Sequence, residues 1–227
     1  MNHTAILKKL KTLGKKKNRD GMARFGINTQ KAFGVSVPDM RAIAKEVGRD
    51  RSVARKLWDS GYHEARIVAS MIDVPGEVTE EQMDEWVLEF NSWDLCDQVI
   101  SNLFRKTVYA DRKAREWCKR EEEFVRRAGY VMIAMLAVSD KKADDEFFVK
   151  YFPLIKKGAT DNRNFVKKGV NWAVRQIGKR NLGLNKKAIA LCCEIEEIDS
   201  PSARWIAKDA IRELDSKEVK ERLKRKK

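Results

Sequence analysis

The sequence predicts an all-α protein in which antiparallel helix pairs stack into an α-solenoid. Three features support this prediction. Apolar residues recur at the three- and four-residue spacing of helices along most of the chain. Few segments alternate β-branched and polar residues between turn signals, so strands are not expected. The connections between helical segments are short, which makes consecutive helices antiparallel neighbours.

In the first half, residues 4–13 have helical spacing and residues 15–21 read as a basic turn. Residues 22–37 show no strong period. Pro38 opens the next helix at its first turn, and Gly48 ends it. Further helices are expected over residues 50–59, 63–72, 80–90 and 93–107. The helix over residues 80–90 follows a capping box that starts at Thr79.

In the second half, helices are expected over residues 111–119, 123–138, 144–157, 164–178, 186–195 and 202–214. A last basic segment, residues 217–227, is expected to form a short helix that frays. We therefore expect a single domain over residues 1–227, with helix pairs of the HEAT kind. The alternative is a compact helical bundle. The solenoid matters for function because it would present a concave, basic face wide enough for a duplex.

The charge balance points to a polyanionic partner. The 227 residues include 48 Lys and Arg against 34 Asp and Glu, giving a net charge of +14. Such a balance is typical of proteins that bind nucleic acid. The alternatives are a solvated basic surface without a specific partner, or attraction to a membrane. Acids are interspersed with the bases and 43% of residues are hydrophobic, which excludes a disordered basic tail.

The cysteines do not predict a metal site or a disulfide framework. No two of the four are spaced as Cys-x-x-Cys, and the chain has 2 His. We expect no metal and no cofactor, and reduced thiols. No apolar run approaches the ~20 residues of a membrane span. The N-terminus lacks an apolar signal core, so an intracellular protein without membrane attachment is expected.

A helix is expected to start within Phe-Asn-Ser-Trp-Asp-Leu-Cys-Asp-Gln-Val, with Asn91 or Ser92 as its side-chain N-cap. The charge of Asp94 is favoured in the first turn. Trp93 and Asp97, four residues apart, lie on the same side at the flank of the apolar stripe. A large aromatic beside a carboxylate, both off the core face, is what a site for a cation needs.

Trp172 is the second candidate aromatic. It turns away from the apolar stripe of its helix, and Gly169, one turn earlier, is expected to leave open space over that face. It is either an exposed stacking surface or a Trp packed on a neighbouring helix. Packing is favoured by the residues alone, because Trp is usually mostly buried.

Two adjacent arginines open the helix expected over residues 123–138. Spacing places Arg126 nearly opposite the core and Arg127 at its flank. Arg127 is therefore the better candidate to contact a phosphate. The alternative is an Arg that bridges adjacent repeats. Each of the other cationic clusters is either solvated surface or the border of a nucleic-acid groove. For Lys167, Lys168 and Arg175, on the helix of Trp172, the border of a groove is favoured.

With these features, the sequence resembles the AlkD family of DNA alkylation repair glycosylases from about residue 22 to residue 214. The resemblance rests on four motifs in order: Phe33-Gly-Val-Ser-Val-Pro-Asp-Met-Arg41, Trp93-x-x-x-Asp97, Arg126-Arg-Ala128 and Phe165-Val-Lys-Lys-Gly-Val-Asn-Trp-Ala-Val-Arg175. It implies HEAT-like repeats with a basic concave face for duplex DNA. It also implies excision of positively charged N3- and N7-alkylated purines, such as 3-methyladenine and 7-methylguanine, in base excision repair.

By the same resemblance, Trp93, Asp97 and Trp172 line the lesion site, and Arg127 fits the Arg that contacts DNA. Phe25 stands where the family often has a Tyr, so the aromatic face is kept and a hydroxyl is lost. The resemblance implies a monofunctional hydrolase without metal or cofactor. We expect a monomer in the cytoplasm that associates with the nucleoid when bound to DNA.

The chemistry agrees with this expectation. An N-alkylated purine is already a good leaving group, so the demanding step is the positive charge that builds on the sugar. A carboxylate such as Asp97 stabilises that charge and orients water. The alternatives are a non-catalytic HEAT-repeat protein that binds damaged or distorted DNA, and a scaffold for protein interactions.

Overall fold

The computed structural model describes residues 1–225 as helices joined by short loops, and these residues contain no β-strand. The all-α prediction is therefore confirmed. The chain divides into two compact units, Met1–Tyr109 and Ala110–Lys227. The expected single domain over residues 1–227 stays a prediction. No helix among the described residues is long and apolar enough to cross a membrane.

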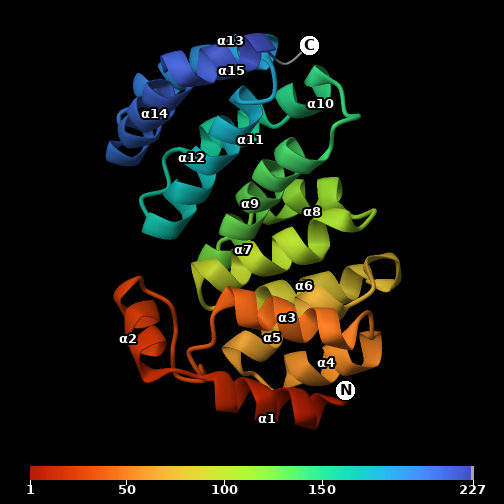
Figure 1. Cartoon of the computed structure of the whole chain (residues 1–227). Helices are drawn as coiled ribbons and strands as arrows, with labels where there is room; N and C mark the ends of the chain where they lie inside the picture. The colour runs from red at the N-terminus through yellow and green to blue at the C-terminus, as the bar shows by residue number, and fades with distance from the viewer. Residues whose placement is uncertain (226–227) are drawn as a thin grey trace. The chain divides into compact units, whose positions relative to one another are not determined.

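Unit 1 contains seven α-helices and two 3₁₀ turns (Figure 1). They are α1 (His3–Leu13), α2 (Lys16–Arg24), α3 (Val37–Val47), α4 (Arg51–Asp59), α5 (His63–Ile72), η1 (Pro75–Glu77), α6 (Glu80–Leu88), α7 (Trp93–Asn102) and η2 (Phe104–Lys106). Helix α5 is central, because α3, α4 and α7 all pack on it. The expected turn over residues 15–21 is wrong, since most of it belongs to α2.

Local signals set the ends of α3. The Ser36 side chain accepts a bond from the Asp39 N–H, Pro38 occupies the first turn, and the helix ends at Gly48 with φ 76°. The loop before it is held by a buried carboxylate. Glu64 of α5 accepts hydrogen bonds from the backbone N–H groups of Phe33, Gly34 and Val35. This is why a chain without helical period there still has a fixed path.

Unit 2 runs through α8 (Ala110–Trp117), α9 (Glu123–Ser139), α10 (Asp145–Val149), α11 (Phe152–Gly158), α12 (Asn164–Gly178), α13 (Leu182–Glu196), α14 (Pro201–Leu214) and α15 (Lys217–Arg225). Helix α9 packs on α8 and α12, and α14 packs on α12 and α13. The single helix expected over residues 144–157 is two, separated before Pro153, whose ring does not fit a helix interior. The short helix expected over residues 217–227 is present as α15, and residues 226–227 of that range lie outside the described residues.

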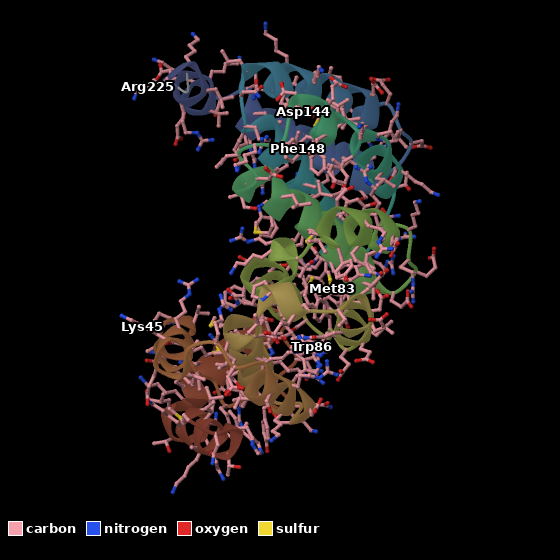
Figure 2. The ribbon with its side chains drawn as sticks, turned by 90° about the vertical axis from the view of Figure 1, so that its right-hand side faces the viewer. Lys45, Met83, Trp86, Asp144, Phe148 and Arg225 are labelled. Atoms are coloured by element: carbon pink, nitrogen blue, oxygen red, sulfur yellow. The ribbon has the colours of Figure 1, made fainter. Side chains whose placement is uncertain are left out.

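Each unit has its own apolar interior. In unit 1, the rings of Trp58 and Trp86 stack with centroids 3.9 Å apart. In unit 2, Phe148 is fully buried. Figure 2 shows Trp86 and Phe148 inside the packed helices, with Lys45 and Arg225 at the outside. These interiors fix the helices that carry the candidate site residues.

Candidate nucleic-acid interface

Helix α7 in unit 1 presents Trp93 and Asp97 as the sequence predicts. Both side chains are half-buried, one turn apart, while Leu95, Cys96, Val99 and Ile100 are buried. The indole Nε1 of Trp93 donates to the backbone carbonyl of Phe25, with 2.9 Å between the nitrogen and the oxygen. This bond joins two segments far apart in sequence. Phe25 itself is 71% exposed, so its ring is available at the surface beside Trp93.

The first turn of α7 differs from expectation. Ser92 occupies the N-cap position, but its side chain makes no capping bond and its buried hydroxyl finds no partner among the described residues. Asp94 is more than a charge near a helix N-terminus. Its Oδ2 lies 2.8 Å from Nε2 of the buried His63, the first residue of α5. Asp94 therefore helps to hold α7 against α5.

Trp172 of α12 in unit 2 is half-buried, so it is not enclosed by a neighbouring helix. With the Gln176 amide turned so that its oxygen faces both donors, that oxygen lies 2.9 Å from Trp172 Nε1 and 3.2 Å from Lys179 Nζ. The indole thus has a fixed orientation on α12. The open space expected over Gly169 is absent, because this buried glycine packs against Arg127 and Tyr130 of α9.

The predicted orientation of the two arginines on α9 is wrong. Arg126 is only 19% exposed and pairs with Asp161 at 3.0 Å and Glu121 at 2.9 Å. Arg127 is 5% exposed, and its Nη1 donates to the Phe165 carbonyl at 2.7 Å. The reason is that both α8 and α12 pack on α9 and bury most of its residues, so a helix with a single apolar face does not describe it. Arg127 bridges adjacent helices here, and its contact with phosphate stays a prediction.

The three cations predicted on α12 differ in their surroundings. Lys168 is exposed, whereas the Lys167 ammonium lies 5.0 Å from the centre of the Trp205 ring. Arg175 pairs with Glu213 of α14. Burial alone would raise the pKa of Glu213, but hydrogen bonding to Lys179 and the charge of Arg175 outweigh it and hold that pKa below its usual value. The charge of Arg175 is thus largely compensated within unit 2.

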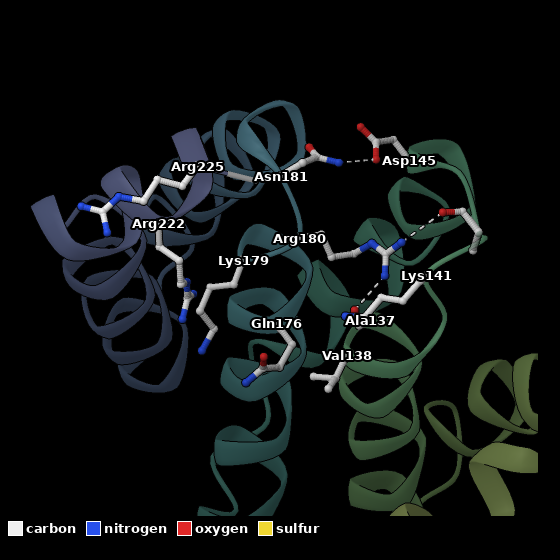
Figure 3. A pocket seen from close by; sticks show the side chains of 11 residues that line it. Ala137, Val138, Lys141, Asp145, Gln176, Lys179, Arg180, Asn181, Arg222 and Arg225 are labelled. Atoms are coloured by element: carbon white, nitrogen blue, oxygen red, sulfur yellow. Dashed lines mark hydrogen bonds between the residues drawn. The ribbon is translucent and has the colours of Figure 1, made fainter. Parts of the chain in front are cut away.

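A basic cleft of about 1000 Å³ opens between the C-terminal ends of α9 and α12 and helix α15 (Figure 3). Gln176 and Lys179 line it, so it adjoins the hydrogen-bonded group that orients Trp172. Its cations are Lys141, Lys179, Arg180, Arg222 and Arg225. The sequence predicted a basic segment over residues 217–227, which contains Arg222 and Arg225, but gave no sign that it meets Lys179 and Arg180 at one cleft. Lys141 was not predicted as part of a site, although the Lys141-Lys142 pair just after the end of a helix is a signal in the sequence.

Arg180 forms the fixed wall of this cleft. Its Nη1 donates to the carbonyls of Ala137 and Asp140 at 2.7 and 2.6 Å, and its guanidinium lies 3.9 Å from the centre of the Phe148 ring. Burial lowers the pKa of Arg180 more than the charges of nearby carboxylates raise it. Within residues 1–225, neither Arg222 nor Arg225 forms an ion pair. Asp145 also lines the cleft and its charge acts on Arg180, and Lys179 pairs with Glu213. In the described part of the chain, the positive charge without a carboxylate partner therefore lies at Lys141, Arg222 and Arg225.

The described residues offer no group of three or more His, Cys, Asp or Glu side chains placed to hold a metal ion. All four cysteines are free thiols. Burial raises the pKa of the Cys118 thiol, and raises that of Cys192 to about 12, so both stay protonated and unreactive at neutral pH.

The fold and these sites define a class: an all-helical repeat protein with an aromatic and a carboxylate at the flank of one helix and a basic cleft beside a second aromatic. Residues 6–214 match the family model described as DNA alkylation repair enzyme. The chain belongs to this family. The predicted family is thus confirmed. No curated protein matches the chain.

A solved structure supports the HEAT-like repeat fold. It is described as a new family of proteins related to the HEAT-like repeat DNA glycosylases with affinity for branched DNA structures. It has a TM-score of 0.78 and 19% identity, covering 94% of this chain and 96% of that chain. A designed armadillo repeat protein in complex with a peptide has a TM-score of 0.35 and 16% identity, covering 82% and 78%, which is too distant to inform the fold.

Proposed function

We propose that this protein is a DNA glycosylase that excises cationic N3- and N7-alkylated purines, such as 3-methyladenine and 7-methylguanine, from duplex DNA. The observation that carries the proposal is the placement of Trp93 and Asp97 one turn apart, both half-buried, at the flank of α7. Membership of the DNA alkylation repair family supports it. Trp93 and Asp97 of unit 1 are the proposed site residues, and a role for Trp172 of unit 2 rests on the family resemblance alone.

The mechanism follows from the charge of the substrate. An alkylated purine leaves as a neutral base, so no general acid is needed, and positive charge develops on the sugar. Asp97 stabilises that charge and orients the attacking water, since a carboxylate fixed on a helix needs little reorganisation. The π-face of Trp93 attracts the cationic base and sugar, and the family resemblance implies the same role for Trp172. No metal or cofactor takes part in this scheme.

DNA binding is assigned to the cationic side chains near these aromatics. Lys168 is the best placed on α12, and Lys167, Arg127 and Arg175 contribute if DNA displaces their present partners. The exposed Phe25 ring contacts the strand beside Trp93. In this proposal the protein acts as an intracellular monomer on nucleoid DNA, across the concave face expected of the repeats.

The alternative is a non-catalytic protein that binds distorted DNA. The structural neighbour described as having affinity for branched DNA structures motivates it. The presence of Asp97 favours the enzyme, because a binding protein needs the cations and has no use for a carboxylate at this flank.

Release of 7-methylguanine and 3-methyladenine from methylated duplex tests the proposal, in single turnover, with wild type and Asp97→Asn. The amide keeps the shape and loses the charge, so the excision rate should fall about 10²–10³-fold. DNA affinity should change far less, because phosphate contacts dominate it. Asp59→Asn, at the exposed C-terminal end of α4, is the matched control. Asp94→Asn is not neutral, because it removes the contact to His63.

Two results separate the alternatives. Binding of branched or methylated duplex without any base release by the wild type favours the non-catalytic protein. Unchanged excision by Asp97→Asn contradicts the role of this carboxylate.

A further inference from the structure

A groove in unit 1 gathers cations without any carboxylate. Its volume is about 300 Å³, and its walls come from the α3 face, the end of α5, the end of α7 and η2. The cationic lining residues are Arg41, Lys45, Arg49 and Lys106. The remaining lining residues are Ala44, Gly48, Met71 and Asn102. A groove so lined attracts anions and repels cations.

The α3 side of the groove follows from sequence spacing. Arg41, Ala44, Lys45 and Gly48 recur at the helical interval, so they share one face of α3. The small residues leave space between the two long cationic side chains. Nothing lies within 4 Å of the position that a Cβ on Gly48 would occupy. Arg41 and Lys45 are both exposed, and neither forms an ion pair within residues 1–225.

The opposite side is held more rigidly. Nη1 of Arg49 donates to the carbonyls of Met71 and Asp73 at 2.9 and 2.5 Å, at the C-terminal end of α5. The Asn102 amide donates to Ser70 Oγ at 3.1 Å. The Arg49 guanidinium is therefore fixed in place, and its charge meets carbonyl dipoles and no carboxylate.

The nearby acids are engaged elsewhere. Glu46 on α3 pairs with Lys9, and the buried Asp73 side chain faces Arg51 and Gln82. Burial lowers the pKa of Lys106, and the charges of Arg105 and Arg49 lower it further. Attraction of cations to helix C-termini accounts for Lys45 and Arg49. This attraction does not explain Arg41, which lies within α3, or Lys106, whose neighbours include both Arg105 and Arg49.

We propose that this groove binds the phosphodiester backbone of a DNA strand. The inference rests on the proposed function and adds a phosphate site away from Trp93 and Asp97. Arginine forks and lysine ammonium groups both suit phosphate oxygens. No aromatic side chain lines the groove, so it offers no platform for base stacking. Binding there is consequently independent of base sequence.

The test is the salt dependence of binding to two undamaged duplexes of unrelated sequence. Arg41→Gln and Lys45→Gln should each lower the slope of log affinity against log salt by about 1, and the double variant by about 2. Both duplexes should weaken equally. Lys186→Gln is the matched control, an exposed lysine on α13 outside the groove. It should keep the wild-type slope.

A second experiment measures the rate at which an amine-acylating reagent modifies the Lys106 side chain. A phosphate in the groove raises the pKa of its amine and lowers the reactive fraction, so duplex DNA should slow its acylation several-fold. Pyrophosphate alone should slow it also, and the double variant should lose both effects. Retained thermal stability of the variants shows that they fold, since removing mutually repelling charges does not weaken packing.

The outcomes are distinguishable. A wild type that binds no duplex overturns the proposed function itself. A wild type that binds duplex, with an unchanged slope in Arg41→Gln/Lys45→Gln, overturns the groove alone. Protection of Lys106 by pyrophosphate but not by duplex identifies a site for free phosphate and also overturns the DNA assignment.

Discussion

The cations of the α3 groove in unit 1 and those along α12 in unit 2 differ in whether a carboxylate lies beside them. Arg41 and Lys45 face other cations, whereas Arg175 and Lys179 both pair with Glu213 of α14. In the sequence, the cations of α3 and those of α12 look alike, because in both cases basic residues are interspersed with acidic ones. The difference teaches that a cluster of Lys and Arg becomes a candidate phosphate site only when the neighbouring helix brings no acid to it.

The largest expected effect concerns an arginine that unit 2 uses for packing. Arg127→Ala removes a buried donor from the Phe165 carbonyl and should lower the free energy of unfolding by about 2–3 kcal/mol. Arg126→Ala should cost less, because its largely buried partner Asp161 keeps its ion pair with Arg163, and its other partners, Glu121 and Arg120, are exposed. Urea denaturation measures both. Weaker DNA binding by Arg127→Ala at full stability would instead assign it to phosphate.

Glu213→Gln tests the comparison directly, because it takes a carboxylate away from the cations of α12 and so makes them more like the cations of the α3 groove. The substitution removes one negative charge that both Arg175 and Lys179 contact, while Asp209 stays 3.9 Å from Arg175. Affinity for duplex DNA should rise about tenfold at low salt, and the salt slope should steepen by about 1. Titration at several salt concentrations measures this. Glu194→Gln, which breaks an exposed pair with Lys156, is the control, and an equal rise there would refute the interpretation.

Acid should weaken unit 2 through Asp161. Burial favours a raised pKa for Asp161, but hydrogen bonds from Arg163 and Arg126 outweigh it, and the pKa lies below its usual value. The folded state therefore gains stability that is complete above the ordinary carboxyl pKa of about 3.9 and is lost as the pH falls through the lower, folded value. Asp161→Asn should be less stable than wild type by about 1 kcal/mol near neutrality.

The measurement is thermal unfolding of wild type and Asp161→Asn from neutral pH to about pH 3, a range that spans the ordinary carboxyl pKa. The difference in unfolding temperature between the two proteins should disappear at the lowest pH. A difference that is constant with pH would mean that Asp161 acts through shape and not through charge.

The smallest stability effect is expected at Phe25. Its backbone carbonyl, and not its ring, accepts the bond from Trp93. Phe25→Ala should therefore change the free energy of unfolding by less than about 0.5 kcal/mol, as for most exposed positions. If the ring contacts DNA, excision should fall all the same. Paired measurements of stability and excision decide, and wild-type excision would remove Phe25 from the interface.

The sequence predicted most helices because their signals are local. The bounds expected for α5 and α12 match the structure, and Ser36, Pro38 and Gly48 mark the ends of α3. Where a signal was weak, the prediction was wrong. Helix α2 buries none of its residues and shows no apolar stripe, and α13 starts at Leu182 because Asn181 caps it. The start of α13 was readable from Asn181 and was missed.

The sequence by itself determined the helical class, the family and the half-buried placement of Trp93 and Asp97 at one flank of α7, since these depend on composition and on spacing within one helix. Only the tertiary structure decided which charges are compensated. Arg127 meets Phe165, Arg175 meets Glu213 and Asp94 meets His63, each across more than 30 residues of sequence. Such partners are set by which helices pack together, and no periodicity within a single helix encodes them.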